Sequence, residues 1–293
     1  MLSPSVSLVK IKKIKSDSSF YADDLLVSEE PLEIRLGYGP AYDREKKNIS
    51  VTMRTPGNDF ELALGFLFTE GIIQNYKDVT HIRYCTDSNR IENKENIVRA
   101  ELDESIFPDL KKLERNFYTA SSCGICGKAS IDSVKIICKT KAFEETLFVS
   151  EKYLFTLTEK LNQQQNIFRH TGGLHASALF DDSGKLVLMR EDIGRHNALD
   201  KLIGASLVSG MMPLEEYVLL LSGRASFELI QKAAIAGISI VATVGAPSNL
   251  AVSLAKEFNM TLIGFLRNET FNIYSGEERI ITDVPADIAD KRK

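Results

Sequence analysis

The C-terminal half of the chain alternates short apolar segments with helical ones, and this order constrains the fold more than any other feature. Tyr217–Leu221, Ser239–Val244 and Thr261–Leu266 are apolar and short enough to predict three strands. Between them, Ala225–Ala236 and Asn249–Phe258 are predicted to be helices. A strand–helix–strand connection makes neighbouring strands parallel and places helices over the sheet. We therefore expect the α/β class with a mostly parallel sheet.

The N-terminal part has a different character. Segments with alternating or β-branched residues, separated by polar turns, predict a strand-rich α+β part over residues 1–115, and residues 116–293 then form the larger domain. The expected strands there are Val6–Val9, Pro31–Leu36, Asn48–Arg54 and Ile97–Leu102, with a helix at Phe60–Glu70. In the larger domain we further expect an amphipathic helix at Ser150–Phe168, a hairpin of His175–Phe180 and Lys185–Arg190, and a helix at Ala198–Val208 capped by Asn197.

Composition excludes several classes of protein. With 293 residues, 44% of them hydrophobic, the chain is not collagen-like, fully disordered or a disulfide scaffold. A net charge of −4 argues against a general nucleic-acid binder, although it leaves room for a local basic pocket for a phosphate. The N-terminus lacks the pattern of a secretory signal, and Ala233–Ala246 is shorter than the roughly 20 apolar residues that span a bilayer. We expect a soluble, cytoplasmic protein without membrane insertion.

The four cysteines indicate a reducing compartment, because so few in a chain of this length make no disulfide framework. Cys123 and Cys126 form a Cys-x-x-Cys motif, a setting that lowers the pKa of a thiol and favours the nucleophilic thiolate. Redox or sulfur chemistry is the favoured interpretation. Half of a zinc site and a plain turn are the alternatives, although Cys85 and Cys138 supply no second Cys-x-x-Cys pair. We expect these two to be buried structural thiols.

Two glycine- and histidine-bearing segments follow, at residues 169–176 and 190–198. Glycines let the backbone approach a ligand closely, and histidines can act as acid, base or hydrogen-bond donor to a phosphate. A tight turn and a solvated charge run are the alternative interpretations. The candidate ligand-binding residues are His170, Gly172, Gly173, His175, Arg195 and His196.

The loops that follow the predicted parallel strands provide further candidates. Ligands of open parallel sheets bind at the carboxyl edge of the strands, and free amides at helix N-termini favour phosphate. Arg224 adds a planar cation there. Simple helix capping is the alternative. The candidates are Ser222, Gly223, Arg224, Pro247 and Ser248, with Phe265–Asn268 at the end of the third strand. Together these loops suggest a nucleotide or another phosphorylated ligand beside a reactive cysteine.

Four motifs occur in an order that resembles the FdhD family, the accessory sulfurtransferases required for formate dehydrogenase. They are Ser-Cys-Gly-Ile-Cys-Gly (122–127), His-Thr-Gly-Gly-Leu-His-Ala (170–176), Arg-Glu-Asp-Ile-Gly-Arg-His-Asn-Ala-Leu-Asp-Lys (190–201) and Ser-Gly-Arg-Ala-Ser-Phe-Glu (222–228). The resemblance extends from about residue 30 to the C-terminus and is most specific over residues 121–275.

The resemblance implies a cytidine deaminase-like, three-layer catalytic domain and a homodimer. It also implies transfer of sulfur from a cysteine desulfurase to the molybdenum cofactor, in its bis(molybdopterin guanine dinucleotide) form, before that cofactor enters formate dehydrogenase. Cys123 would carry the persulfide with Cys126 as its partner, and a guanine nucleotide would mimic the cofactor. The family's cofactor-binding stretch corresponds to Phe265, Leu266, Arg267, Asn268, Glu269 and Thr270.

Two other functions compete with sulfur transfer. A zinc-dependent deaminase needs a His-x-Glu sequence and a Pro-Cys-x-x-Cys motif. This chain contains no His-x-Glu, and Ser122 rather than proline precedes Cys123, so no metal site is expected. A non-catalytic chaperone that only holds the cofactor or its target enzyme is the second competitor, and the presence or absence of added sulfur on Cys123 discriminates between the two.

Overall fold

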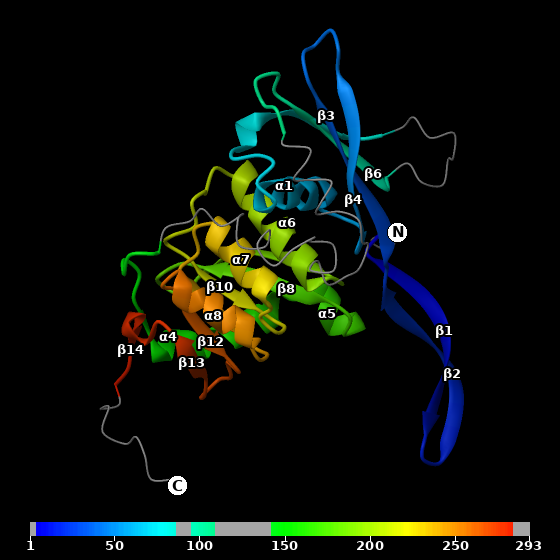
Figure 1. The fold of residues 1–293 in the computed structure, drawn as a ribbon. Coiled ribbons are helices and arrows are strands. Elements are labelled where there is room, and N and C mark those ends of the chain that lie inside the picture. The colour runs from blue at the N-terminus through cyan, green and yellow to red at the C-terminus, as the bar shows by residue number, and fades with distance from the viewer. Residues whose placement is uncertain (1–3, 86–94, 109–141, 284–293) are drawn as a thin grey trace. The chain divides into compact units, whose positions relative to one another are not determined.

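The computed structural model describes residues 4–85, 95–108 and 142–283 (Figure 1). These residues form a mixed α/β fold with two compact units. The first unit comprises the described residues of Met1–Lys139, Gln165–Ser177 and Met189–Met212; the second comprises those of Thr140–Gln164, Ala178–Leu188 and Pro213–Lys293. The units are interleaved along the chain, whereas the predicted parts, 1–115 and 116–293, are continuous.

The first unit contains a four-stranded sheet with the order β4-β3-β6-β5. β3 pairs antiparallel with β4 and parallel with β6, and β5 pairs antiparallel with β6. One face is apolar because alternate residues of β3 and β6 point into a core shared with helix α1. The bounds are β3 (Glu30–Tyr38), β4 (Glu45–Arg54), β5 (Val79–Tyr84), β6 (Ile97–Leu102), α1 (Asp59–Thr69) and a short 3-10 helix, η1 (Tyr76–Asp78).

Helix α6 (Arg195–Val208) crosses α1 with the two backbones almost in contact. A Cβ atom added to Gly65 would lie 1.9 Å from the carbonyl oxygen of Asp200, and one added to Gly204 would lie 1.9 Å from that of Glu61. Glycine at both positions is therefore what permits this crossing. The predicted start of α6 at Ala198 is wrong by one turn, because Gly194 rather than Asn197 is the residue that caps it.

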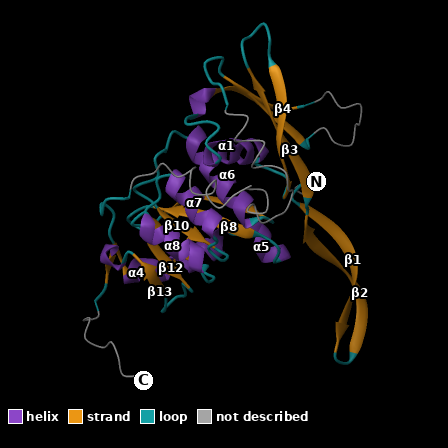
Figure 2. Ribbon diagram, viewed as in Figure 1, coloured by secondary structure: helices purple, strands orange, loops and turns teal. Residues whose placement is uncertain are grey.

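Strands β1 (Val6–Lys15) and β2 (Ser18–Val27) form a separate antiparallel ribbon (Figures 1 and 2). Its register runs from Val6 opposite Val27 to Lys15 opposite Ser18. Only Val6–Val9 was predicted as strand, because the lysine-rich continuation and the acidic second strand give no clear alternation. Large apolar side chains such as Leu8, Ile14 and Tyr21 are exposed on it.

The larger sheet has the order β13-β12-β11-β10-β8-β9. Its strands β10, β11 and β12 pair parallel, as the alternation of strands and helices predicted, and β13 pairs antiparallel with β12. Helices α7 and α8 lie side by side over these strands (Figure 1). The bounds are β8 (His175–Phe180), β9 (Leu186–Asp192), β10 (Val218–Leu221), α7 (Phe227–Ile235), β11 (Ile240–Thr243), α8 (Asn249–Glu257), β12 (Thr261–Gly264) and β13 (Asn272–Ser275).

The single helix predicted over Ser150–Phe168 is in fact two, α4 (Glu151–Gln164) and α5 (Asn166–Thr171). Gln165 leaves the helical conformation with ψ 72° and is buried. Its side-chain amide donates to the Glu191 carboxylate at 3.3 Å, a tertiary contact that local periodicity does not reveal. The remaining elements are β7 (Val149–Ser150), which pairs parallel with β14 (Ile280–Ile281), and the 3-10 helix η4 (Glu277–Arg279).

Candidate functional site

The predicted reactive cysteines, Cys123 and Cys126, lie outside the described residues, as does Cys138. Cys85 is described and is buried with 4% of its surface exposed, which confirms the expectation of a structural thiol. The geometry of the site therefore comes from the candidate ligand-binding residues, which fall into one group in each unit.

In the second unit, the loops that follow β10, β11 and β12 bind one another through their backbones. The amide of Gly245 donates to the carbonyl of Gly223 at 2.9 Å, and the amide of Phe265 donates to the carbonyl of Gly245 at 3.0 Å. A β-bridge joins Ala225 to Pro247. The predicted residues Ser222–Arg224, Pro247–Ser248 and Phe265–Leu266 are thus brought together at one edge of the sheet.

Glycine is needed for this close approach of the loops. A Cβ atom on Gly245 would lie 2.9 Å from the carbonyl oxygen of Gly223, and one on Gly264 would lie 2.8 Å from Cδ of Pro247. Beyond Gly264, Phe265 has φ 55°, a left-handed conformation that costs energy for a residue with a side chain. Its ring is 42% exposed at this edge. The sequence carries no signal for this strained, exposed aromatic residue.

The polar side chains of this edge divide into structural and available groups. Ser248 caps α8, because its hydroxyl accepts from the amide of Ala251 at 3.2 Å, so the capping alternative holds for that side chain. Arg267 donates to the carbonyl of Val244 at 2.7 Å, and Asn268 accepts from the Thr158 hydroxyl at 2.9 Å. Arg224 is exposed and makes no ion pair among the described residues, which leaves its guanidinium available to an anion.

The rest of the predicted 265–270 stretch flanks these contacts. Leu266 is fully buried, and its amide donates to the carbonyl of Thr243 at 3.0 Å, so it anchors the stretch to β11. The amide of Arg267 donates to the carbonyl of Thr270 at 2.8 Å, which closes a turn around the exposed Glu269. The stretch is therefore a tight loop held at both ends, with its backbone close to Gly245.

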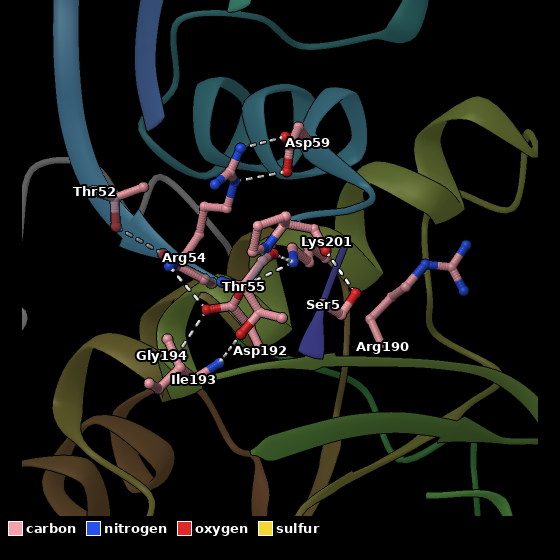
Figure 3. Close-up of polar contacts among 12 residues, drawn as sticks. Ser5, Thr52, Arg54, Thr55, Asp59, Arg190, Asp192, Ile193, Gly194 and Lys201 are labelled. Atoms are coloured by element: carbon pink, nitrogen blue, oxygen red, sulfur yellow. Dashed lines mark hydrogen bonds and ion pairs between the residues drawn. The ribbon is translucent and has the colours of Figure 1, made fainter. Parts of the chain in front are cut away.

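In the first unit, the segment between β9 and α6 is fixed by a buried polar network (Figure 3). The Asp192 carboxylate is fully buried and lies 2.7 Å from the ammonium of Lys201, which is itself 1% exposed. Thr55, from the end of β4, donates its amide to the same carboxylate at 3.1 Å. Asn197, predicted as a helix cap, instead lies within α6 and donates to Asp192 at 3.1 Å and to the carbonyl of Met53 at 2.8 Å.

Arg195 and His196 are the first two residues of α6, directly after the fixed segment. The Nε atom of Arg195 is buried and has no hydrogen-bond partner among the described residues. An orphaned buried donor at a helix N-terminus is consistent with an anionic ligand there. The same unit contains Arg190, whose guanidinium binds the Glu61 carboxylate of α1 through two hydrogen bonds of 2.5 and 2.8 Å.

The other predicted residues of the first unit lie around the start of β8. Gly172 ends α5 with φ 66°, a conformation suited to glycine. Gly173 packs against the ribbon, since a Cβ atom there would lie 3.0 Å from a methyl group of Val27. His175 begins β8 and is partly buried, and the side chain of His170 lies outside the described ones.

Burial also shifts the pKa of one acid in this segment. The pKa of Glu191 is raised because burial disfavours its charged form, although hydrogen bonds from Gln165 and from the backbone of Phe168 oppose that shift. Among the described residues, no group of three or more histidine, cysteine, aspartate or glutamate side chains is arranged to hold a metal ion. No helix in the described part is long and apolar enough to cross a membrane.

The fold and these loops define an α/β protein in which glycine-containing loops meet at one edge of the larger sheet. The chain belongs to the FdhD/NarQ family, whose model matches residues 27–281. It is 47% identical to the sulfur carrier protein FdhD of Streptomyces avermitilis, over 92% of this chain and 94% of that protein. It is 42% identical to the sulfur carrier protein FdhD of Sulfurisphaera tokodaii, over 94% of this chain and 99% of that protein.

A crystal structure from Desulfotalea psychrophila, provisionally described as a formate dehydrogenase accessory protein, has the same fold. The TM-score is 0.72 at 22% sequence identity, and the match covers 95% of this chain and 100% of that one. The family expectation drawn from the four motifs is thereby confirmed. The likeness of the larger sheet to cytidine deaminases stays a prediction.

Proposed function

We propose that this protein is a cytoplasmic sulfurtransferase that carries sulfur as a persulfide on Cys123. The sulfur comes from a cysteine desulfurase and passes to the molybdenum cofactor, in its bis(molybdopterin guanine dinucleotide) form, before that cofactor enters formate dehydrogenase. Membership of the FdhD/NarQ family carries the proposal, together with the Cys-x-x-Cys motif. A homodimer is the assembly that the family resemblance favours.

Loading of Cys123 is an exchange between a thiolate and a persulfide. The Cys123 thiolate attacks the outer sulfur of the persulfide on the desulfurase, so that a new S–S bond forms on Cys123 while the S–S bond on the desulfurase breaks. The desulfurase cysteine leaves as a thiolate, and the number of electrons is unchanged. Cys123 then carries the transferable sulfur.

Release of the sulfur uses Cys126. Its thiolate attacks the inner sulfur of the Cys123 persulfide, forms a disulfide with Cys123 and displaces the outer sulfur as hydrosulfide, which passes to the bound cofactor. The resulting disulfide must be reduced by two thiols, in two exchange steps, before the next cycle. A cellular dithiol of the thioredoxin class can supply that reduction.

Two groups of described residues support the proposal that the phosphates and guanine ends of such a cofactor bind this protein. The sheet edge of the second unit offers the exposed Arg224 guanidinium, the exposed Phe265 ring and a backbone that glycine allows a ligand to approach. The helix N-terminus of the first unit offers the orphaned Nε of Arg195. We assign the binding of a guanine nucleotide phosphate to each of these groups within its own unit, with Ser222, Gly223 and Pro247 shaping the edge of the second unit.

Mass spectrometry after incubation with a cysteine desulfurase and cysteine tests the transfer. We expect one added sulfur on the peptide that contains Cys123, no addition in Cys123→Ala, and loss of formate dehydrogenase activity in cells that carry only that variant. Cys85→Ala is the matched control and should accept sulfur normally, because Cys85 is buried. Full formate dehydrogenase activity with Cys123→Ala would contradict the persulfide role.

The same experiment distinguishes sulfur transfer from the function of a chaperone that only holds the cofactor. That alternative predicts binding of a guanine nucleotide such as guanosine diphosphate without any added sulfur. Arg224→Ala should weaken nucleotide binding in either case, because both functions use the same sheet edge. Sulfur on Cys123 therefore favours transfer, and its absence together with nucleotide binding favours holding.

A further inference from the structure

Asp192 lies just before the start of α6 and forms a buried ion pair with Lys201, which lies within that helix (Figure 3). We infer that this pair is a positioning device: it fixes the backbone of Ile193 and Gly194 and so sets Arg195 and His196 for binding the phosphate-bearing ligand. The inference rests on the proposed function, because it assigns a role to residues that act through that ligand site.

Every acceptor site of the Asp192 carboxylate is used. One oxygen of Asp192 accepts from the Gly194 amide at 2.8 Å and from the Asn197 side chain at 3.1 Å. The other accepts from the Thr55 amide at 3.1 Å and from the Lys201 ammonium at 2.7 Å. Four donors saturate the roughly four lone-pair sites of a carboxylate, so its orientation is unique.

Thr55 is held in the same network at three of its atoms. Its amide binds Asp192, its carbonyl accepts from the Lys201 ammonium at 2.8 Å, and its hydroxyl accepts from the Ile193 amide at 3.2 Å. The end of β4, the end of β9 and the second turn of α6 therefore form one rigid junction. A shift of the segment before Arg195 would break several of these bonds together.

Two charges taken out of water lose their hydration, and a buried ion pair therefore adds little net stability compared with an apolar pair of similar size. The pair instead fixes the orientation of each backbone group to which it is hydrogen-bonded. The junction positions Arg195 but does not use its Nε donor, which has no hydrogen-bond partner among the described residues.

The test uses Asp192→Asn and the double variant Asp192→Asn/Lys201→Met in the full chain. An asparagine side chain has one acceptor oxygen and one donor nitrogen. In Asp192→Asn the new NH2 group therefore faces donors that it cannot bind: either the Gly194 backbone amide and the Asn197 side-chain amide, or the Thr55 backbone amide. We expect the dissociation constant for guanosine diphosphate, measured by calorimetry, to rise about tenfold, the effect typical of residues that orient a binding group. Amides of residues 193–197 should exchange hydrogen faster in both variants.

Two measurements separate positioning from simple support of the fold. The single variant leaves Lys201 charged and unpaired, so the double variant should recover thermal stability without recovering nucleotide affinity. Asp59→Asn is the matched control, because it breaks the buried pair of Asp59 with Arg54, 2.9 Å apart in the same unit, without touching residues 192–196. It should lower stability and leave the nucleotide affinity unchanged.

A folded double variant with the wild-type dissociation constant, or with wild-type exchange at residues 193–197, overturns the inference. If Asp192→Asn fails to fold, the double variant still decides, since it contains no unpaired buried lysine. A wild-type protein that binds no guanosine diphosphate would count against the proposed ligand rather than the junction. The exchange of residues 193–197 then tests the junction by itself.

Discussion

At the scale of single residues, two buried ion pairs accompany the apolar core of the first unit. Arg54 is 1% exposed and holds Asp59 through two hydrogen bonds of 3.0 and 2.9 Å, and Asp192 and Lys201 form a second buried pair. Each charge must find its partner in space, since an uncompensated buried charge is strongly destabilising. These pairs therefore fix how the end of β4 meets both α1 and α6.

Glu191 provides a pH-dependent test at this scale. Burial raises its pKa in the folded state, so the folded protein binds the proton more tightly than the unfolded chain does. The free energy of unfolding should consequently fall as pH rises through the raised pKa. Above that pKa, the destabilisation caused by the buried, charged carboxylate is fully present. Glu191→Gln keeps an acceptor for the Gln165 amide and should be more stable than wild type at neutral pH.

Chemical denaturation of both proteins between acidic and neutral pH checks this expectation. The difference in free energy of unfolding should shrink towards acidic pH, where Glu191 of the wild type is protonated. Glu29→Gln, at an exposed position, is the control and should show no such trend. A constant difference at every pH would argue against the burial of a charged Glu191.

At the scale of elements, the crossing of α1 and α6 is set by two glycines. Residues Asn197–Leu207 of α6 are all buried, which is unusual for a helix of a small unit and explains the weak amphipathic pattern in its sequence. The close contact at Gly65 and Gly204 lets backbone pack on backbone. This contact fixes where α6, and hence the segment before it, lies against β4.

Gly204→Ala should therefore be destabilising even though alanine favours helices. The added Cβ would lie 1.9 Å from the carbonyl oxygen of Glu61, a backbone atom that cannot move alone. Overpacking of this kind costs about 1–3 kcal/mol or more, which thermal or urea denaturation will measure. Val208→Ala at the exposed end of the same helix should change stability by no more than about 0.5 kcal/mol.

At the scale of the whole molecule, stability is unevenly distributed among the described elements. The ribbon of β1 and β2 pairs only with itself, and most of its side chains are exposed. Strands β10, β11 and β12 are fully buried. An isolated two-stranded hairpin is marginally stable in water, whereas central strands open only with the fold.

Hydrogen exchange measured by mass spectrometry should show this contrast directly. Peptides from residues 6–27 should exchange orders of magnitude faster than peptides from β10–β12, because local opening of the ribbon exposes little apolar surface. Exchange in the ribbon as slow as in β11 would mean that the ribbon is covered by another molecule in solution. Dilution of the protein would then restore the fast exchange.

The sequence by itself determined the parallel order of β10, β11 and β12, because a helix between strands leaves little choice of direction. It also determined the family, through motifs at residues 122–127, 170–176, 190–201 and 222–228. Only the tertiary structure decided that Gln165 breaks a helix, that Asn197 binds Asp192 rather than capping α6, and that Lys201 reaches back to Thr55. Local patterns record which face of an element is apolar. A buried polar group, in contrast, often finds its hydrogen-bond partner on a residue distant in sequence, and only the packing of the complete fold brings the two together.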